Sequence, residues 1–230
     1  MVVMQQQRGG LISGYVSMLF IRVATSVDKL YDSKIKSAHL MVVSLLLSAP
    51  AAWGLASCRP QFATSFILFM VLFSRLSTSL EFVQKTQTSI STLFGSLTSQ
   101  LKEIAIYTAL AVYAIQHVPD LSLWMIVLLA GTSFLSEFVV TLSDKELQLA
   151  KIKIGNKLSE HMPLTHEMRM FILAVALLLG ALEPVTRGLI ALNLLVVALH
   201  FIQTAQALSV ATAEAHKKPE HSPAKSKAKK

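Results

Sequence analysis

The sequence predicts an all-α membrane protein, with about six transmembrane helices and an amphipathic N-terminal helix at the membrane interface. Of its 230 residues, 53% are hydrophobic and 15% are charged, and the mean hydropathy is +0.56. Soluble domains carry more charge and less apolar surface. Because a spanning helix uses roughly 20 apolar residues, the chain has room for about six such helices and little else.

The first helix is expected over residues 11–31. Its apolar residues recur at helical spacing, but Arg22, Asp28 and Lys29 interrupt the apolar face. An incomplete apolar face is typical of a helix that lies along a membrane surface. We therefore expect residues 1–37 to form a cytoplasmic segment that contains an interfacial helix.

Residues 38–210 are expected to form the six-helix transmembrane domain. Short polar or proline-containing turns separate its apolar runs, and the fifth run ends near Glu183 and Pro184, where we expect the chain to turn. The six predicted spans are 39–57, 62–82, 93–115, 121–142, 168–183 and 189–208.

Residues 211–230 are rich in Lys, Pro, Ser and Ala, and are expected to be a disordered basic tail. Lysines near a membrane surface attract anionic lipid headgroups by about 1 kcal/mol each. No aromatic residue lies between these lysines, which argues against nucleic-acid binding. The expected partners of the chain are the lipid bilayer and anionic headgroups.

The basic residues also predict the orientation. Nearly all of them fall in the N-terminal segment, the turn at Lys85, the stretch 145–169 and the tail, whereas the other side holds only Arg59 and Arg187. Cytoplasmic loops carry the excess of Lys and Arg in membrane proteins. We expect a multi-pass protein of the cell membrane with both termini in the cytoplasm.

A polar stretch from Arg75 to Glu103 is the candidate functional site. It covers the end of the second predicted span and the start of the third, so its residues lie at one membrane depth. Residues three or four apart share a helix face, and Gly95 permits close approach of the two backbones. Ionisable groups at membrane depth are costly and are functional candidates by default.

The residues of this stretch resemble the motif of the CDP-alcohol phosphatidyltransferases, especially the phosphatidylinositol-phosphate synthase type. Thr92-Leu93-Phe94-Gly95 is similar to the family's Thr-Arg-Phe-Gly, and two further segments, 166–169 and 203–209, resemble the starts and ends of the family's later helices. Anchored on Gly95, the family spacing falls on Thr78, Glu81, Phe82, Lys85, Thr86, Gly95, Ser99 and Glu103.

The resemblance implies a two-metal site. In the family, four aspartates hold two divalent ions on the CDP-alcohol diphosphate, and the last aspartate acts as base. By position, Thr78, Glu81, Gly95 and Ser99 would then bind the substrate complex. Glu81 and Glu103 would hold Mg or Mn, and Glu103 would be catalytic. The resemblance also implies that Arg169 contacts a headgroup, although an ordinary positive-inside arginine is equally consistent with its place in the sequence.

The chain departs from this motif at every fixed position except Gly95. Thr78 and Ser99 supply no carboxylate, and magnesium demands near-octahedral oxygen ligands at roughly 2.0–2.1 Å. Lys85 and Lys102 stand near the remaining carboxylates, so we expect internal ion pairs in place of the metal ions.

A simpler explanation of the charged residues stays open. Glu81 and Lys85 could form an ordinary helix pair, and Lys102 and Glu103 could extend to the interface.

Two function hypotheses follow. The favoured one is a non-catalytic pseudoenzyme of phospholipid biosynthesis that needs no cofactor and serves as a scaffold or partner subunit. The resemblance implies a homodimer, and a heteromer with another membrane protein is the alternative. The second hypothesis is an active or residual Mg- or Mn-dependent transferase that uses a CDP-linked lipid and an alcohol acceptor.

Other kinds of site find little support in the sequence. His161, His166 and Glu167 have a spacing only loosely similar to that of a zinc helix, and Pro163 disfavours a continuous helix there. Cys58 lies on a predicted outer turn, which we expect to be away from every histidine, so Cys/His catalysis is not expected.

Overall fold

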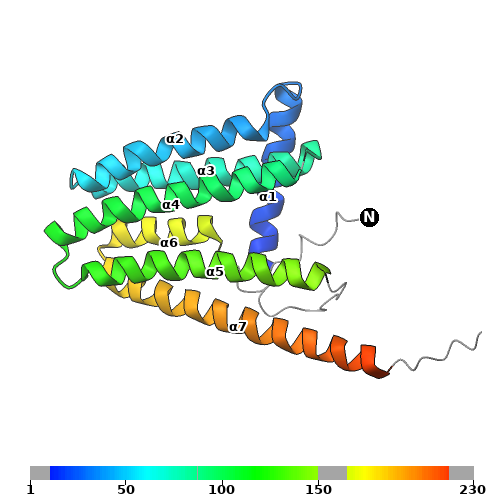
Figure 1. Ribbon diagram of the computed structural model, residues 1–230. Coiled ribbons are helices and arrows are strands. Elements are labelled where there is room, and N and C mark those ends of the chain that lie inside the picture. Colours follow the sequence, from blue (N-terminus) through cyan, green and yellow to red (C-terminus); the bar gives the residue numbers. More distant parts are fainter. Residues whose placement is uncertain (1–10, 87, 150–164, 218–230) are drawn as a thin grey trace, which may run out of the picture.

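The computed structural model describes residues 11–86, 88–149 and 165–217, and every regular element in these ranges is an α-helix. Six helices, α2 to α7, run roughly alongside one another, and α1 lies across one end of them (Figure 1). The predicted all-α class is confirmed.

Helix α1 spans Leu11–Leu30 and contacts α3. Its Ala24 is buried against Leu76 and Leu80, which lie near the end of α3. The crossing direction of α1 suits a helix that rests on a membrane surface, and its interfacial position stays a prediction (Figure 1).

Helices α2 (Ser37–Ala56), α3 (Pro60–Gln84) and α4 (Ser89–His117) form the first half of the bundle. Pro60 starts α3 at a position where no backbone N–H is needed. Thr88 caps α4 by accepting a hydrogen bond from the Ser91 backbone N–H. Helices α2 and α3 meet closely at Gly54, where an added Cβ would lie 3.0 Å from the Ala63 nitrogen.

Helices α5 (Leu123–Leu149), α6 (His166–Leu179) and α7 (Leu182–Lys217) form the second half. The turn between α6 and α7 was predicted at Glu183 and Pro184, and this is wrong. The chain turns at Gly180, whose left-handed φ of 66° caps α6, while Pro184 lies in the first turn of α7, where it costs no hydrogen bond.

The last helix also differs from expectation. It continues to Lys217, which is inside the stretch 211–230 that we expected to be disordered. Residues 218–230, which carry the other lysines of the predicted tail, lie outside the described residues, as do residues 150–164 with His161 and Pro163.

Four of the described helices are long and apolar enough to cross a membrane: Ser37–Ala56, Pro60–Gln84, Leu123–Ser143 and Leu182–Val210. Helix α4 carries Lys102 and Glu103 in its first half, and α6 has 14 residues. At 1.5 Å per residue α6 is about 21 Å long, shorter than the ~30 Å hydrocarbon core of a bilayer. The predicted count of six spans therefore stays a prediction.

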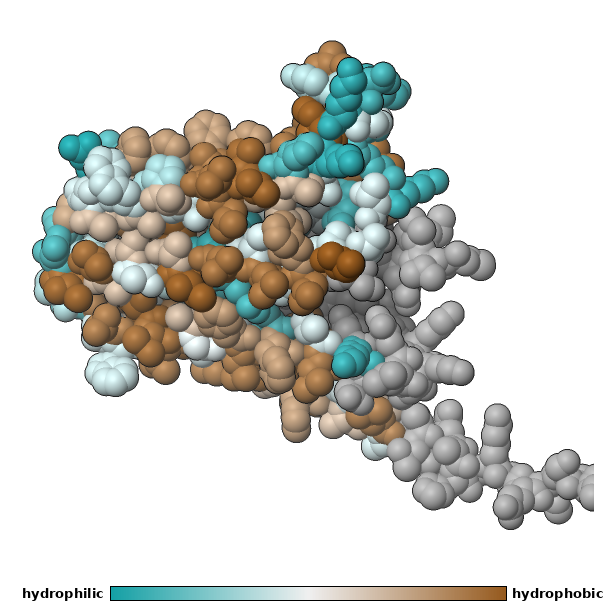
Figure 2. All heavy atoms as spheres, turned by 45° about the horizontal axis from the view of Figure 1, so that its top comes forward, coloured by the Kyte–Doolittle hydropathy of each residue, from teal (hydrophilic) through white to brown (hydrophobic). Residues whose placement is uncertain are grey.

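The distribution of apolar residues suits a lipid environment. A core cluster with Leu55, Ile67, Leu110 and Leu129 joins the helices of the bundle. Large apolar side chains also remain exposed along the flanks, and on the face shown in Figure 2 they cover most of the surface between more polar ends. Such extensive exposed apolar surface is unusual for a soluble monomer.

Candidate functional site

Helix α3 ends, and α4 and α6 begin, at the same end of the bundle (Figure 1). Polar side chains of these helices gather toward this end. They form two adjoining groups, which are a pocket between α2, α3, α4 and α6 and a buried network of ion pairs among α4, α5 and α6. Lys102 and Glu103, neighbours on α4, belong to different groups.

The pocket has a volume of about 190 Å³. Thr78 and Glu81 of α3 line it, together with Gly95 and Ser99 of α4. These are four of the positions that the family spacing selected. The four residues meet at this pocket, but the expected close approach of α3 and α4 at Gly95 is wrong. Helix α2 packs against both helices, and the atom nearest to a Cβ built at Gly95 is Met41 Cε of α2, at 3.5 Å. Glu103 is not among the lining residues.

Glu81 is 7% exposed, and within the described part of the chain its Oε1 has no hydrogen-bond partner. The expected pair with Lys85 is wrong, because no salt bridge between these two described residues is formed. Lys85 adopts a left-handed φ of 52° at the end of α3. This conformation takes its exposed side chain off the helical stripe that carries Glu81.

Lys102 is 1% exposed, so it does not extend to the interface. Its Nζ donates hydrogen bonds to Ser44 Oγ at 3.1 Å and to Ser74 Oγ at 3.2 Å. Ser74 in turn donates to Glu167 Oε1 at 3.2 Å, and Arg75 lies 3.9 Å from the other oxygen of Glu167. The hydroxyl group of Ser74 therefore lies between the ammonium of Lys102 and the carboxylate of Glu167.

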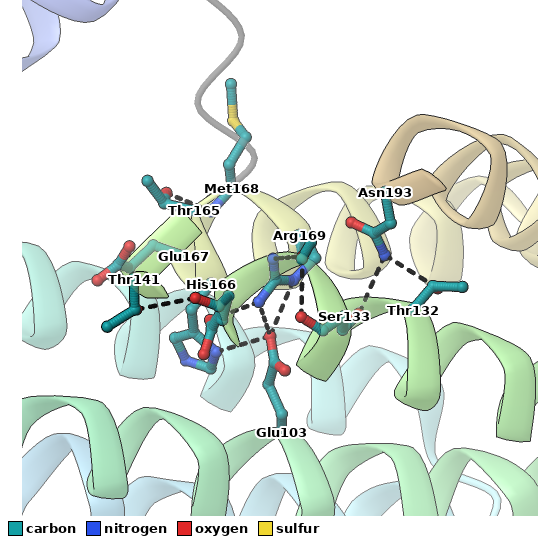
Figure 3. Close-up of polar contacts among 12 residues, drawn as sticks. Glu103, Thr132, Ser133, Thr141, Thr165, His166, Glu167, Met168, Arg169 and Asn193 are labelled. Carbon is teal, nitrogen blue, oxygen red and sulfur yellow. Dashed lines mark hydrogen bonds and ion pairs between the residues drawn. The ribbon is translucent and has the colours of Figure 1, made fainter. Parts of the chain in front are cut away.

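Glu103 is also 1% exposed and is held by α6. Its Oε1 accepts hydrogen bonds from Arg169 Nε at 2.9 Å and from Arg169 Nη2 at 2.7 Å, and His166 Nδ1 lies 3.1 Å away. Both side chains point at this carboxylate in Figure 3. An internal ion pair was expected at Glu103, but its partner is Arg169 rather than a lysine.

Arg169 joins three helices. Besides Glu103 of α4, its Nη2 contacts Glu137 Oε1 of α5 at 2.6 Å. The guanidinium is fully buried, so in this structure it meets carboxylates instead of the headgroup expected from the resemblance. His166 and Arg169, three residues apart at the start of α6, share one face, so their spacing indicates that they contact the same neighbouring helix but does not say which one.

A second polar layer continues from this network toward α7. Tyr107 Oη lies 3.1 Å from Ser133 Oγ. Asn193 Nδ2 donates to Ser133 Oγ at 3.1 Å and to Thr132 Oγ1 at 3.3 Å (Figure 3). Sequence reasoning missed this layer. The isolated Asn193 within an apolar run is the residue that could have indicated it, because an amide at membrane depth requires partners.

The residues present do not fit the metal site of the family. Glu81 lines the pocket, whereas Glu103 is turned toward Arg169 and His166. Among the described residues, no group of three or more His, Cys, Asp or Glu side chains is arranged to hold a metal ion. Mg and Mn need several converging oxygen ligands, and these two carboxylates do not supply them.

The expectation that Cys58 lies away from every histidine is wrong. Its Sγ is 3.5 Å from His117 Nδ1 and 3.0 Å from Gln116 Oε1, on the opposite end of the bundle from the pocket. The turn after α2 and the end of α4 come together there, a long-range contact that the sequence pattern does not reveal.

Comparison with known proteins identifies no family for this chain. No protein-family model matches the chain, and a search of curated proteins gave no match. The resemblance to CDP-alcohol phosphatidyltransferases therefore depends on the spacing of residues 78–103 and on the order of the helices.

Proposed function

We propose that this protein is a non-catalytic relative of the CDP-alcohol phosphatidyltransferases that serves as a scaffold or partner subunit in the membrane. The observation that carries the proposal is the buried ion pair at Glu103, the position of the family's base. A carboxylate that accepts hydrogen bonds from a buried guanidinium favours its charged form and is a poor proton acceptor.

The same ion pairs support a structural role. Arg169 connects α4 and α5 through Glu103 and Glu137, and both contacts are shielded from solvent on the arginine side. Buried charge pairs contribute little net stability but strongly penalise arrangements that break them. They would hold the three helices in one arrangement, which is what a subunit with a fixed partner surface requires.

Two measurements test the proposal. The purified chain, supplied with a CDP-linked lipid, an alcohol acceptor and Mg or Mn, should transfer no phosphatidyl group. Solubilised from its native membrane in mild detergent, it should migrate as a homodimer or as a complex with one membrane protein of fixed stoichiometry. A single monomeric species without a partner would contradict the scaffold role.

The second candidate is a Mg- or Mn-dependent transferase, although the two carboxylates of the motif positions do not converge as a metal site requires. One observation keeps it as a candidate: Glu81 lies in the pocket wall with three other motif positions, and none of the described residues donates a hydrogen bond to its Oε1. Metal-dependent transfer that disappears in Glu103→Gln would establish this activity and exclude the scaffold as the main role. Glu183→Gln, a carboxylate on the other end of the bundle, is the matched control and should leave such transfer unchanged.

A further inference from the structure

We propose that the pocket between α3 and α4 binds a small molecule that carries a primary ammonium group. This inference goes beyond the scaffold role and requires no catalysis. It depends on the hydrogen-bonding character of the pocket wall, on the buried carboxylate of Glu81, and on the size of the pocket.

Three hydroxyl groups of the wall have already used their hydrogens. Ser77 Oγ donates to the Ser37 carbonyl at 2.8 Å, Thr78 Oγ1 to the Ser74 carbonyl at 3.2 Å, and Thr98 Oγ1 to the Gly95 carbonyl at 2.9 Å. A hydroxyl has one hydrogen to donate and two lone pairs that accept. These three residues therefore offer a ligand acceptors and no donor.

Glu81 adds a stronger acceptor to the same wall. Its side chain is more than nine-tenths buried and lines the pocket, and no described residue donates to its Oε1. Leaving a buried carboxylate oxygen without a donor is costly. An ammonium group supplies three N–H donors and the opposite charge, which together match one carboxylate and neighbouring hydroxyl oxygens.

Other ligand chemistries fit less well. An anion would meet the carboxylates of Glu81 and Glu167, and two of the three N–H donors of the lining cation, Lys102, are already bonded to Ser44 and Ser74. A bare metal ion is much smaller than a pocket of about 190 Å³. That volume corresponds to roughly six water molecules at ~30 Å³ each, so a small organic amine such as ethanolamine fits and leaves room for water or for a larger amine.

The test uses the full-length protein in detergent and isothermal titration calorimetry with ethanolamine. Ethylene glycol, which has the same shape but carries a neutral hydroxyl in place of the ammonium, is the control ligand. We expect saturable binding of ethanolamine, with ethylene glycol at least about tenfold weaker, the loss expected for a charge-assisted hydrogen bond.

Substitutions in the pocket wall test whether ethanolamine binds in the pocket. Glu81→Gln keeps the side-chain shape and should weaken ethanolamine binding about tenfold or more, whereas Glu183→Gln should not change it. Thr78→Val removes one acceptor from a partly accessible position and should weaken binding several-fold, so the proposal stays testable even if Glu81→Gln does not fold. Circular dichroism and a monodisperse elution profile establish which variants are folded.

An experiment in lipid vesicles distinguishes a lipid headgroup from a soluble amine as the source of the ammonium group. The protein is reconstituted with phosphatidylglycerol alone or mixed with phosphatidylethanolamine, and bound lipid is measured by native mass spectrometry. Retention of phosphatidylethanolamine by the unmodified chain but not by Glu81→Gln identifies a lipid headgroup. Binding of free ethanolamine without lipid retention identifies a soluble amine, and both outcomes support the proposal.

Four results would overturn it. These are no saturable binding of ethanolamine, equal binding of ethylene glycol, unchanged binding in Glu81→Gln, and displacement of ethanolamine by Mg²⁺ at constant ionic strength. None of them depends on transferase activity. Detection of transfer would contradict the scaffold role and leave amine binding as a separate question.

Discussion

Arg169 is the residue on which the charge balance of the bundle interior depends. It is fully buried, and its Nη2 contacts both Glu103 and Glu137. Removing one partner of a buried ion pair leaves the other charge without compensation, which is far more costly than the pair itself is stabilising. The two carboxylates would then face each other across α4 and α5.

Replacement of Arg169 should therefore destabilise the protein strongly. Arg169→Met should lower the free energy of unfolding by about 3–5 kcal/mol, measured as a lower Tm in detergent. Arg187→Met, which removes the more exposed partner of Glu183, is the control and should cost no more than about 1 kcal/mol. Combining Arg169→Met with Glu103→Gln and Glu137→Gln should restore part of the loss. An unchanged Tm for Arg169→Met alone would contradict the account.

At the scale of single elements, the apolar runs predicted the helices well. Helices α2 to α5 lie close to the expected ranges, because a run of about 20 apolar residues between polar turns has few alternative structures. The turn between α6 and α7 was predicted at the wrong residues because a proline usually marks the end of a helix. Proline is also tolerated in the first turn of a helix, which is where Pro184 lies. Gly180, with no side chain to resist a positive φ, ends α6 instead.

The sequence predicted the residues of the pocket but not the ion pair of Glu103 with Arg169. Thr78, Glu81, Gly95 and Ser99 line one pocket because α3 and α4 follow each other across a short turn and both pack against α2. Glu103 and Arg169 are 66 residues apart, and no local pattern encodes which distant helix turns toward α4. A basic residue at a span boundary is explained equally well by orientation, so the buried pair could not be inferred from the sequence.

Gly180 provides a prediction for the end of α6. Its φ is 66° and nothing lies within 4 Å of a Cβ built there, so only backbone strain would oppose a side chain. Gly180→Ala should destabilise the protein by about 1–2 kcal/mol. Gly131→Ala is the matched control, because Gly131 lies within α5 and also has nothing within 4 Å, and it should stabilise by up to ~1 kcal/mol. Equal shifts in Tm for the two variants would rule out strain as the cause.

At the scale of the whole molecule, the two ends of the bundle differ in chemistry. Helix α1 crosses the end of the bundle at which α3 ends and α4 begins (Figure 1). The pocket and the exposed Lys85 lie toward this end, whereas Cys58, after α2, meets His117, the last residue of α4, at the other end. If the positive-inside rule sets the orientation, the first end faces the cytoplasm. The pocket would then be open to the compartment in which polar amines and phospholipid precursors are made available.

The single cysteine of the chain allows this orientation to be measured directly. Cys58 is partly exposed, so a membrane-impermeant maleimide should label it in intact cells whose outer surface is accessible. The variant Cys58→Ser/Thr86→Cys moves the thiol to the exposed turn after α3 and should be labelled only after the membrane is permeabilised. The opposite topology would be shown if sealed cells gave labelling of the Thr86→Cys variant and no labelling of Cys58 in the unmodified chain. The pocket would then open away from the cytoplasm, and a cytoplasmic amine could not be its ligand.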